Sequence, residues 1–283
     1  QIDIDLVISI GGGSSIDIAK LYSSCILNEE NLINVSQLLN RKSQDCIFSV
    51  AVPTTAGSGA ESTKFATIWS KKSKEKLSFE NENLIPNYVY LIPEYTTSLS
   101  YELTLTTTLD SLCHCIDSIL NQNSNNESIS LSVEAINLIS ENLNLLLNDL
   151  NNKNLRTSIL NASNLAGKAI NISRTSLNHA ISYPLTNYYE LPHGLACAFS
   201  VIETVEYFKN EISDKSYGKY LIKASEAIKN LSLSEIYKQY LDKLDVELIT
   251  KNTLNNSRYE NFRFELNSSV VKEIIQKSKL YYI

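Results

Sequence analysis

Four residues in the sequence have types and spacings that suit a metal ion: Asp110, His114, His179 and His193. The aspartate and the first histidine are four residues apart, so on a helix their side chains project from one face. One carboxylate and three imidazoles suit Fe²⁺ or Zn²⁺, whereas Mg²⁺ and Ca²⁺ would need more oxygen ligands. A second interpretation stays open at this point, because an isolated Asp/His pair at this spacing is more often a surface pair on a helix.

The elements that would position these residues differ between the two parts of the chain. Short apolar runs over residues 6–10, 47–52 and 88–92 predict strands, and the first two are expected to be fully buried. The first run ends in a glycine triplet followed by a segment where a helix can start. A strand, glycine turn and helix in this order are typical of an α/β fold.

From Tyr101 onward, apolar residues recur at helical spacing. This spacing predicts helices over residues 101–121, 128–149, 153–172 and 175–183, with more between 216 and 245 and a last one near 268–280. The stretch between His179 and His193 contains Pro184 and Pro192, which predict a loop. We therefore expect an α/β domain over residues 1–98 and an all-helical domain over residues 99–283.

Composition and charge exclude several classes of function. The chain has 283 residues, 43% of them hydrophobic, and a net charge of -6, which gives no electrostatic reason to bind nucleic acid or an anionic membrane. No apolar run approaches the about 20 residues that span a bilayer. The five cysteines are odd in number and form no CxxC pair, which favours reduced thiols in a cytoplasmic protein over a disulfide framework.

Four ordered segments resemble the iron-containing alcohol dehydrogenase family. They are IGGGSSIDIAK (residues 10–20), PTTAGSGAE (53–61), DSLCH (110–114) and NHAISYPLTNYYELPHG (178–194). The resemblance implies that Asp110, His114, His179 and His193 are the metal ligands. It also implies a partial Rossmann-like dinucleotide-binding part followed by a helical metal-binding part, as in dehydroquinate synthase-like folds.

The family's cofactor is a nicotinamide dinucleotide, NAD(H) or NADP(H). The resemblance assigns cofactor contacts to Gly12, Gly13, Ser14, Asp17, Thr54, Thr55, Ser58 and Lys76. Glycines allow the pyrophosphate to approach the backbone, and the N-terminus of the following helix favours its negative charge. A plain tight turn remains the alternative for the glycine triplet alone, and a solvated strand-end charge remains the alternative for Lys76.

Several segments resemble a narrower subgroup, the phosphonoacetaldehyde reductases: KFATIW (64–69), LAGKAINISRT (165–175) and AISYPLT (180–186). Tyr183 stands where most family members carry a histidine with a proton-relay role. A phenol with a reference pKa of about 10 is a poorer acid–base at neutral pH, but it can still hydrogen-bond to substrate or ribose.

A phosphonate substrate needs cationic partners. The candidates are Lys168 and Arg174, just before His179, with Lys64 as a weaker one. Solvated helix charges are the alternative interpretation of Lys168 and Arg174.

The resemblance also implies a strand–helix–strand portion before the first motif, which we expect to be missing from this chain. The chain is then either part of a longer protein or a truncated and inactive family member. We expect a homodimer that reduces a small aldehyde, with phosphonoacetaldehyde as the favoured substrate. A generic primary-alcohol or diol dehydrogenase and a lyase of the dehydroquinate synthase kind are the other possibilities.

Overall fold

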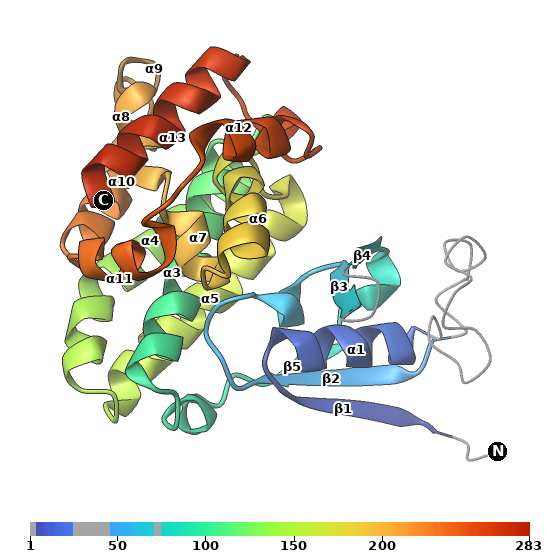
Figure 1. Cartoon of the computed structure of the whole chain (residues 1–283). Coiled ribbons are helices and arrows are strands. Elements are labelled where there is room, and N and C mark those ends of the chain that lie inside the picture. Colours follow the sequence, from blue (N-terminus) through green and yellow to red (C-terminus); the bar gives the residue numbers. More distant parts are fainter. Residues whose placement is uncertain (1–3, 25–45, 71–74) are drawn as a thin grey trace.

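The computed structural model describes residues 4–24, 46–70 and 75–283 (Figure 1). Strands β1 (Leu6–Gly11), β2 (Phe48–Pro53) and β5 (Tyr88–Val89) form a parallel sheet in the order β1-β2-β5. A turn at Gly12 joins β1 to helix α1 (Gly13–Ser23), which packs on the sheet. The predicted strand, glycine turn and helix are confirmed, and β5 is shorter than the run over residues 88–92 that predicted it.

A second sheet, not predicted from the sequence, is a hairpin of β3 (Phe65–Ser70) and β4 (Glu75–Glu80). Its apolar residues Ala66 and Phe79 pack with Leu21 of α1 in a small core. Strand β4 is short and begins with charged residues, so its sequence carries only a weak strand signal. Three short 3₁₀ turns, Ala60–Ser62, Glu82–Leu84 and Pro93–Thr96, connect the strands to one another and to the helices.

The expectation that the first two strands are fully buried is wrong for β1, and in β2 it fails at Phe48, which is 45% exposed. Leu6, Ile8 and Ile10 are 45%, 57% and 59% exposed, whereas Ser9, on the opposite face of the strand, is 8% exposed. Strand side chains alternate between the two faces of a sheet. Helix α1 covers only one of these faces, so among the described residues the other face is open.

The rest of the chain is helical, as the sequence predicted. The helices are α3 (Tyr101–Ile119), α4 (Asn126–Asn148), α5 (Lys153–Ser173), α6 (Leu177–Tyr189), α7 (His193–Ala198), α8 (Val201–Tyr207), α9 (Lys209–Ser213), α10 (Gly218–Lys229), α11 (Ser234–Leu241), α12 (Val246–Leu254) and α13 (Ser268–Tyr282). One large apolar core holds them together. Helix α3 lies near its middle, packing against α4, α5, α6, α7 and α10. None of the helices in the described ranges is long and apolar enough to span a bilayer.

The predicted loop around Pro184 is instead helix. Proline cannot donate to the carbonyl one turn earlier, so it usually ends a helix. Helix α6 nevertheless runs through Pro184 to Tyr189, because Ile181 and Leu185 on either side are fully buried. Burial of this apolar face outweighs the loss of one hydrogen bond. The short helices α7, α8, α9 and α12 were also not predicted, since too few turns repeat for their period to be read.

Two glycines allow the two parts of the chain to touch. A Cβ on Gly59 would stand 2.5 Å from the Cα of Gly167 in α5. Gly59 also has a φ of 60°, which other residues adopt only at a cost. The loop after β2 therefore rests directly on the backbone of α5, and it brings the glycine-rich turns close to the helices.

Candidate metal centre and adjoining cleft

Helix α3 carries three ionisable residues on one face. Asp110, His114 and Asp117 follow one another at intervals of four and three residues, which places them one above the other. They are 9%, 6% and 0% exposed. The Nε2 atom of His114 lies 3.5 Å from Oδ1 of Asp110. Buried charge of this kind needs compensation, which here has to come from other helices.

The two later histidines supply it from α6 and α7. Oδ1 of Asp110 lies 3.5 Å from Nε2 of His179 and 3.8 Å from Nε2 of His193. The ring centroids of His114 and His179 are 4.7 Å apart, and those of His179 and His193 are 5.7 Å apart. The structure thus brings all four residues of the predicted metal set together.

Close packing between α7 and α3 makes this convergence possible. A Cβ on Gly194 would stand 1.7 Å from the carbonyl oxygen of Thr106. Only a glycine allows the two backbones to come this close. Gly194 directly follows His193 in the sequence. The absence of a side chain at Gly194 therefore determines how closely α7 packs against α3.

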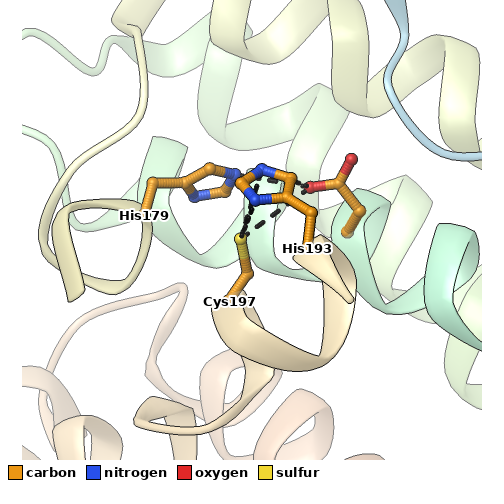
Figure 2. Close-up of side chains that lie close together, drawn as sticks. His179, His193 and Cys197 are labelled. Carbon is orange, nitrogen blue, oxygen red and sulfur yellow. Dashed lines mark hydrogen bonds and ion pairs between the residues drawn. The ribbon is translucent and has the colours of Figure 1, made fainter. Parts of the chain in front are cut away.

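A fifth donor was missed in the sequence. Cys197 lies one turn after His193 on α7, and Figure 2 shows both side chains directed toward His179. Its Sγ is 3.6 Å from Nε2 of His193 and 4.0 Å from Oδ1 of Asp110. Donor atoms of Asp110, His179, His193 and Cys197 all lie within 4.8 Å of one another. The interval of four residues from His193 was the available signal.

Asp117 was missed as well, although it follows His114 by one helical turn. Its carboxylate accepts a hydrogen bond from Nδ1 of His179 at 2.8 Å, and others from the backbone N–H groups of Ser176 and His179. Burial acts to raise the pKa of Asp117, but the hydrogen bonds from His179, Ser176 and Asn178 and the charge of His179 together outweigh it, so the pKa is lowered. A carboxylate at Nδ1 turns the lone pair of Nε2 toward Asp110, as is usual for metal-binding histidines.

Electrostatics make the centre attractive to a cation. Burial favours the neutral form of Asp110, yet the neighbouring histidines hold its pKa well below the usual range. Burial lowers the pKa of His114 to about 4, so its imidazole is neutral at neutral pH. Burial also opposes charge on His193, but Cys197 and Asp110 raise its pKa to about 9. The carboxylates of Asp110 and Asp117 therefore stabilise positive charge in this site, which the imidazoles of His179 and His193 can carry in the metal-free chain, since the pKa of each is raised.

One buried atom tests whether a metal fits. Nε2 of His179 is buried and makes no hydrogen bond to the described residues, although it faces Asp110. Such an atom costs free energy unless something satisfies it. A divalent ion among the donors would do so, and the nitrogen, oxygen and sulfur set is one that iron and zinc accept.

The centre opens into a cavity of about 960 Å³. Its walls include Asp110, His114, His179 and His193 from the helices, and Gly12, Gly13, Ser14, Asp17, Thr55 and Ser58 from the glycine-rich turns. The volume is within the range of cofactor and substrate sites. Thr54 does not line the cavity, and its N–H donates to the carbonyl of Gly11. Lys76 lies on β4, but its side chain is outside the described part of the structure.

Asp17 also has a structural task that the sequence did not indicate. Its Oδ2 accepts the N–H of Thr67 in β3, and its Oδ1 lies 3.4 Å from Nζ of Lys20. Lys20 is 2% exposed and donates to the carbonyl oxygens of Ala60 and Phe65. The two residues connect α1 to the hairpin and to the loop after β2, and they hold these cavity walls in place.

The proposed substrate cations take different positions. Arg174 lines the cavity and pairs with Glu80 of β4, at 2.6 Å. Lys168 is exposed on α5 and is not among the lining residues. Lys64 lies in a smaller adjoining hollow of about 420 Å³, paired with Glu82 at 3.0 Å.

Tyr183 lies in the cavity wall, 9% exposed, with its ring centroid 6.1 Å from that of His193. The guanidinium of Arg258 stacks over the tyrosine ring at 5.1 Å, and Arg258 also lines the cavity. This arginine comes from the segment after α12, far from any motif, so no sequence signal pointed to it.

Comparison with known proteins identifies the family. The model "Iron-containing alcohol dehydrogenase" matches residues 1–93, and "Fe-containing alcohol dehydrogenase family, C-terminal" matches residues 104–260. The chain belongs to the iron-containing alcohol dehydrogenase family. The predicted family membership and fold class are thereby confirmed.

Individual members of the family show moderate identity. The chain is 33% identical to phosphonoacetaldehyde reductase of Streptomyces viridochromogenes over 209 residues, which are 72% of this chain and 53% of that protein. It is 32% identical to alcohol dehydrogenase 4 of Saccharomyces cerevisiae over 194 residues, 69% of this chain and 50% of that one. The chain thus spans about half the length of these curated relatives.

A solved structure shows the same fold. Sulfoacetaldehyde reductase from Bifidobacterium kashiwanohense, in complex with NAD⁺, superposes with a TM-score of 0.82 at 22% identity. The match covers 96% of this chain and 76% of that chain.

Proposed function

We propose that this chain carries the catalytic site of a metal-dependent oxidoreductase that transfers a hydride between NAD(H) or NADP(H) and a small aldehyde or alcohol. One observation carries the proposal. The donors of Asp110 and the three histidines open into the same cavity as the glycine turn that begins α1. A cavity with metal donors and a helix N-terminus suits a reaction that brings a metal and a dinucleotide together.

The metal would be Fe²⁺ or Zn²⁺, held by Asp110, His114, His179 and His193. A divalent ion bound there supplies a Lewis acid for the substrate oxygen, while the nicotinamide supplies the hydride. Asp117 keeps Nε2 of His179 aimed at the centre through its bond to Nδ1. Packing of Gly194 on Thr106 holds α7 at the required depth.

The dinucleotide would bind along the glycine-rich turns. Gly12, Gly13 and Ser14 line the cavity at the N-terminus of α1, and the N-terminus of a helix favours the negative charge of a pyrophosphate. Thr55 and Ser58, in the loop after β2, also line this cavity and carry hydroxyl groups that can hydrogen-bond to the cofactor. Of the other expected contacts, Asp17 lines the cavity, Thr54 does not, and the side chain of Lys76 lies outside the described part of the structure.

Tyr183 would orient the substrate or the ribose. Its hydroxyl group belongs to a buried ring near His193, and the cation of Arg258 stacks on that ring. A hydroxyl group in this place can donate a hydrogen bond to an oxygen that gains negative charge during reduction.

Phosphonoacetaldehyde is the substrate that we propose, because the relative of that name is 33% identical over 209 residues. Within the cavity, Arg174 and Arg258 provide guanidinium groups for an anionic substrate. Guanidinium groups bind tetrahedral oxyanions through paired hydrogen bonds.

The test is the ratio of kcat/KM for phosphonoacetaldehyde to kcat/KM for a neutral aldehyde of similar size. A charge-assisted hydrogen bond contributes on the order of 1.5–3 kcal/mol, so Arg174→Ala should lower this ratio roughly ten- to a hundredfold. Lys168→Ala is the matched control, because Lys168 is exposed and does not line the cavity. Equal use of both aldehydes by the wild type would remove the phosphonate assignment.

A second candidate, a dehydrogenase of uncharged primary alcohols, is favoured by one contact. Arg174 is already paired with Glu80 at 2.6 Å, so its charge is compensated before any substrate binds. A preference of the wild type for the neutral aldehyde would favour this second candidate. The Arg174–Glu80 pair would then be part of the cavity wall, and the substrate would be an uncharged primary alcohol.

A further inference from the structure

Arg258 is a cation of the cavity wall whose charge is not compensated by any carboxylate of the described residues. It is half-buried, and its Nε donates to Oγ1 of Thr175 at 3.1 Å. Within the described ranges, neither of its Nη atoms makes a hydrogen bond or an ion pair. Arg174, which also lines the cavity, is already paired with Glu80 at 2.6 Å. Arg258 therefore leaves a positive charge in the cavity for an anionic ligand.

The position of this guanidinium is fixed before a ligand binds. Its carbon stacks over the Tyr183 ring at 5.1 Å from the ring centroid, and the backbone N–H of Arg258 donates to Oδ1 of Asn256 at 3.0 Å. The side chain of Asn261 donates to the carbonyl of Thr175 at 3.0 Å and ties the same segment to the turn before α6. A charged group held in this way loses little conformational entropy when it binds a ligand.

Thr186 offers a second unused polar group in the same cavity. Its Oγ1 is buried and makes no hydrogen bond to the described residues, and Thr186 lines the cavity one helical turn after Tyr183. Helical threonines elsewhere, such as Thr108, Thr157 and Thr250, donate their hydroxyl to the carbonyl four residues earlier. A buried hydroxyl without a partner costs free energy, so the hydroxyl of Thr186 also favours a ligand in the cavity.

Tyr183 places these two groups near the proposed metal centre. Its ring centroid lies 6.1 Å from that of His193 and 5.1 Å from the guanidinium carbon of Arg258. Helix α6, which carries Tyr183 and Thr186, packs against the turn Tyr259–Asn261 that directly follows Arg258. Only a few bonds can therefore separate an aldehyde at the metal centre from an anionic group at Arg258.

We propose that Arg258 and Thr186 form the subsite for the anionic end of the substrate, so that the cavity takes short aldehydes that carry a phosphonate or a sulfonate. The two Nη atoms donate a pair of hydrogen bonds, and the Thr186 hydroxyl donates a third. These donors match a group with three terminal oxygens better than a carboxylate with two. This inference rests on the proposed function, because it assigns the residues that recognise the charge of its substrate.

The test compares kcat/KM for phosphonoacetaldehyde with kcat/KM for tert-butylacetaldehyde, in which an uncharged group of the same shape replaces the phosphonate. Arg258→Gln should lower the ratio of the two roughly ten- to a hundredfold, and Thr186→Val roughly three- to tenfold. Arg263→Gln is the matched control, because Arg263 stacks over Tyr217 at 5.4 Å in the same segment and does not line the cavity. It should keep the wild-type ratio, and all three variants should bind NADH as the wild type does.

Other results would overturn the subsite. If the wild type prefers the phosphonate and both Arg258→Gln and Thr186→Val keep its ratio, the subsite is refuted and the proposed function stands. Weaker NADH binding by Arg258→Gln at an unchanged ratio would assign this cation to the phosphates of the cofactor instead. Equal use of both aldehydes by the wild type would remove the phosphonate substrate and the subsite together. If Arg258→Gln does not fold, Arg258→Lys replaces it, and its ratio should still fall because an ammonium group cannot donate the paired hydrogen bonds.

Discussion

Gly194 lies so close to Thr106 that a single added methyl group would overlap the threonine carbonyl oxygen, at 1.7 Å. Helix α7 therefore carries His193 and Cys197 into contact with α3 only because no side chain stands between them. A backbone contact between two helices thus sets the spacing of the proposed metal ligands.

Gly194→Ala should separate α7 from α3 and open the group of donors. Overpacking at a buried contact costs on the order of 1–3 kcal/mol, so both the free energy of unfolding and the bound metal should fall. Denaturant unfolding and metal analysis of the purified variant would measure these losses. A variant with native stability and a full complement of metal would show that α7 tolerates displacement.

The metal-set residues were predictable only through the family resemblance. Their types and intervals alone left a surface pair on a helix as an alternative, and the ordered family motifs then predicted that Asp110, His114, His179 and His193 share a site. In the folded chain Oδ1 of Asp110 lies within 3.8 Å of all three imidazoles. The helical second part was also predictable, since its long helices repeat their apolar period several times.

Other features depend on contacts between distant segments. Lys20 contacts Ala60 and Arg258 contacts Tyr183 only in the folded chain. The residues next to Lys20 and Arg258 in the sequence therefore do not predict these contacts. Pro184 shows the opposite case, in which a strong local signal is overruled by the burial of Ile181 and Leu185. One face of β1 is exposed because no described segment covers that side of the sheet. The sequence of β1 alone does not predict which segments will cover it.

Asp117→Asn should weaken metal binding without unfolding the chain. The amide cannot keep the same acceptor geometry at Nδ1 of His179, and loss of such a partner typically costs 10–100-fold in metal affinity. Competition with a chelator would measure the affinity. Asp149→Asn, at an exposed helix end, is the control and should bind metal as the wild type does. Equal affinities for both variants would refute the role of Asp117.

Lys20 should make stability depend on pH in the alkaline range. Burial is the main cause that lowers its pKa from 10.5 to about 8. Between these values the unfolded chain binds more protons than the folded one, so this contribution to stability rises with pH. Its slope is about 1.4 kcal/mol per pH unit at most.

Unfolding free energies of wild type and Lys20→Met at pH 8 and pH 9.5 would isolate this contribution. The variant should be less stable at both pH values, because the carbonyls of Ala60 and Phe65 lose their donor. The deficit of the variant should widen at pH 9.5. A deficit that shrinks with pH would mean that Lys20 is held in its charged form.

Tyr183→Phe should reduce kcat more than it weakens substrate binding, if the hydroxyl acts only in the transition state. Steady-state kinetics across the pH range would measure both quantities. Tyr188→Phe is the control, because Tyr188 lies on the same helix and is 56% exposed. Unchanged turnover in Tyr183→Phe would reduce this residue to packing.

The central claim is that one divalent metal is held by Asp110 and the histidines, and metal analysis of wild type and His193→Ala tests it most directly. We expect close to one equivalent of iron or zinc in the wild type, and loss of both the metal and the activity in the variant. A His193→Ala chain that kept its full metal content and its activity would contradict this claim.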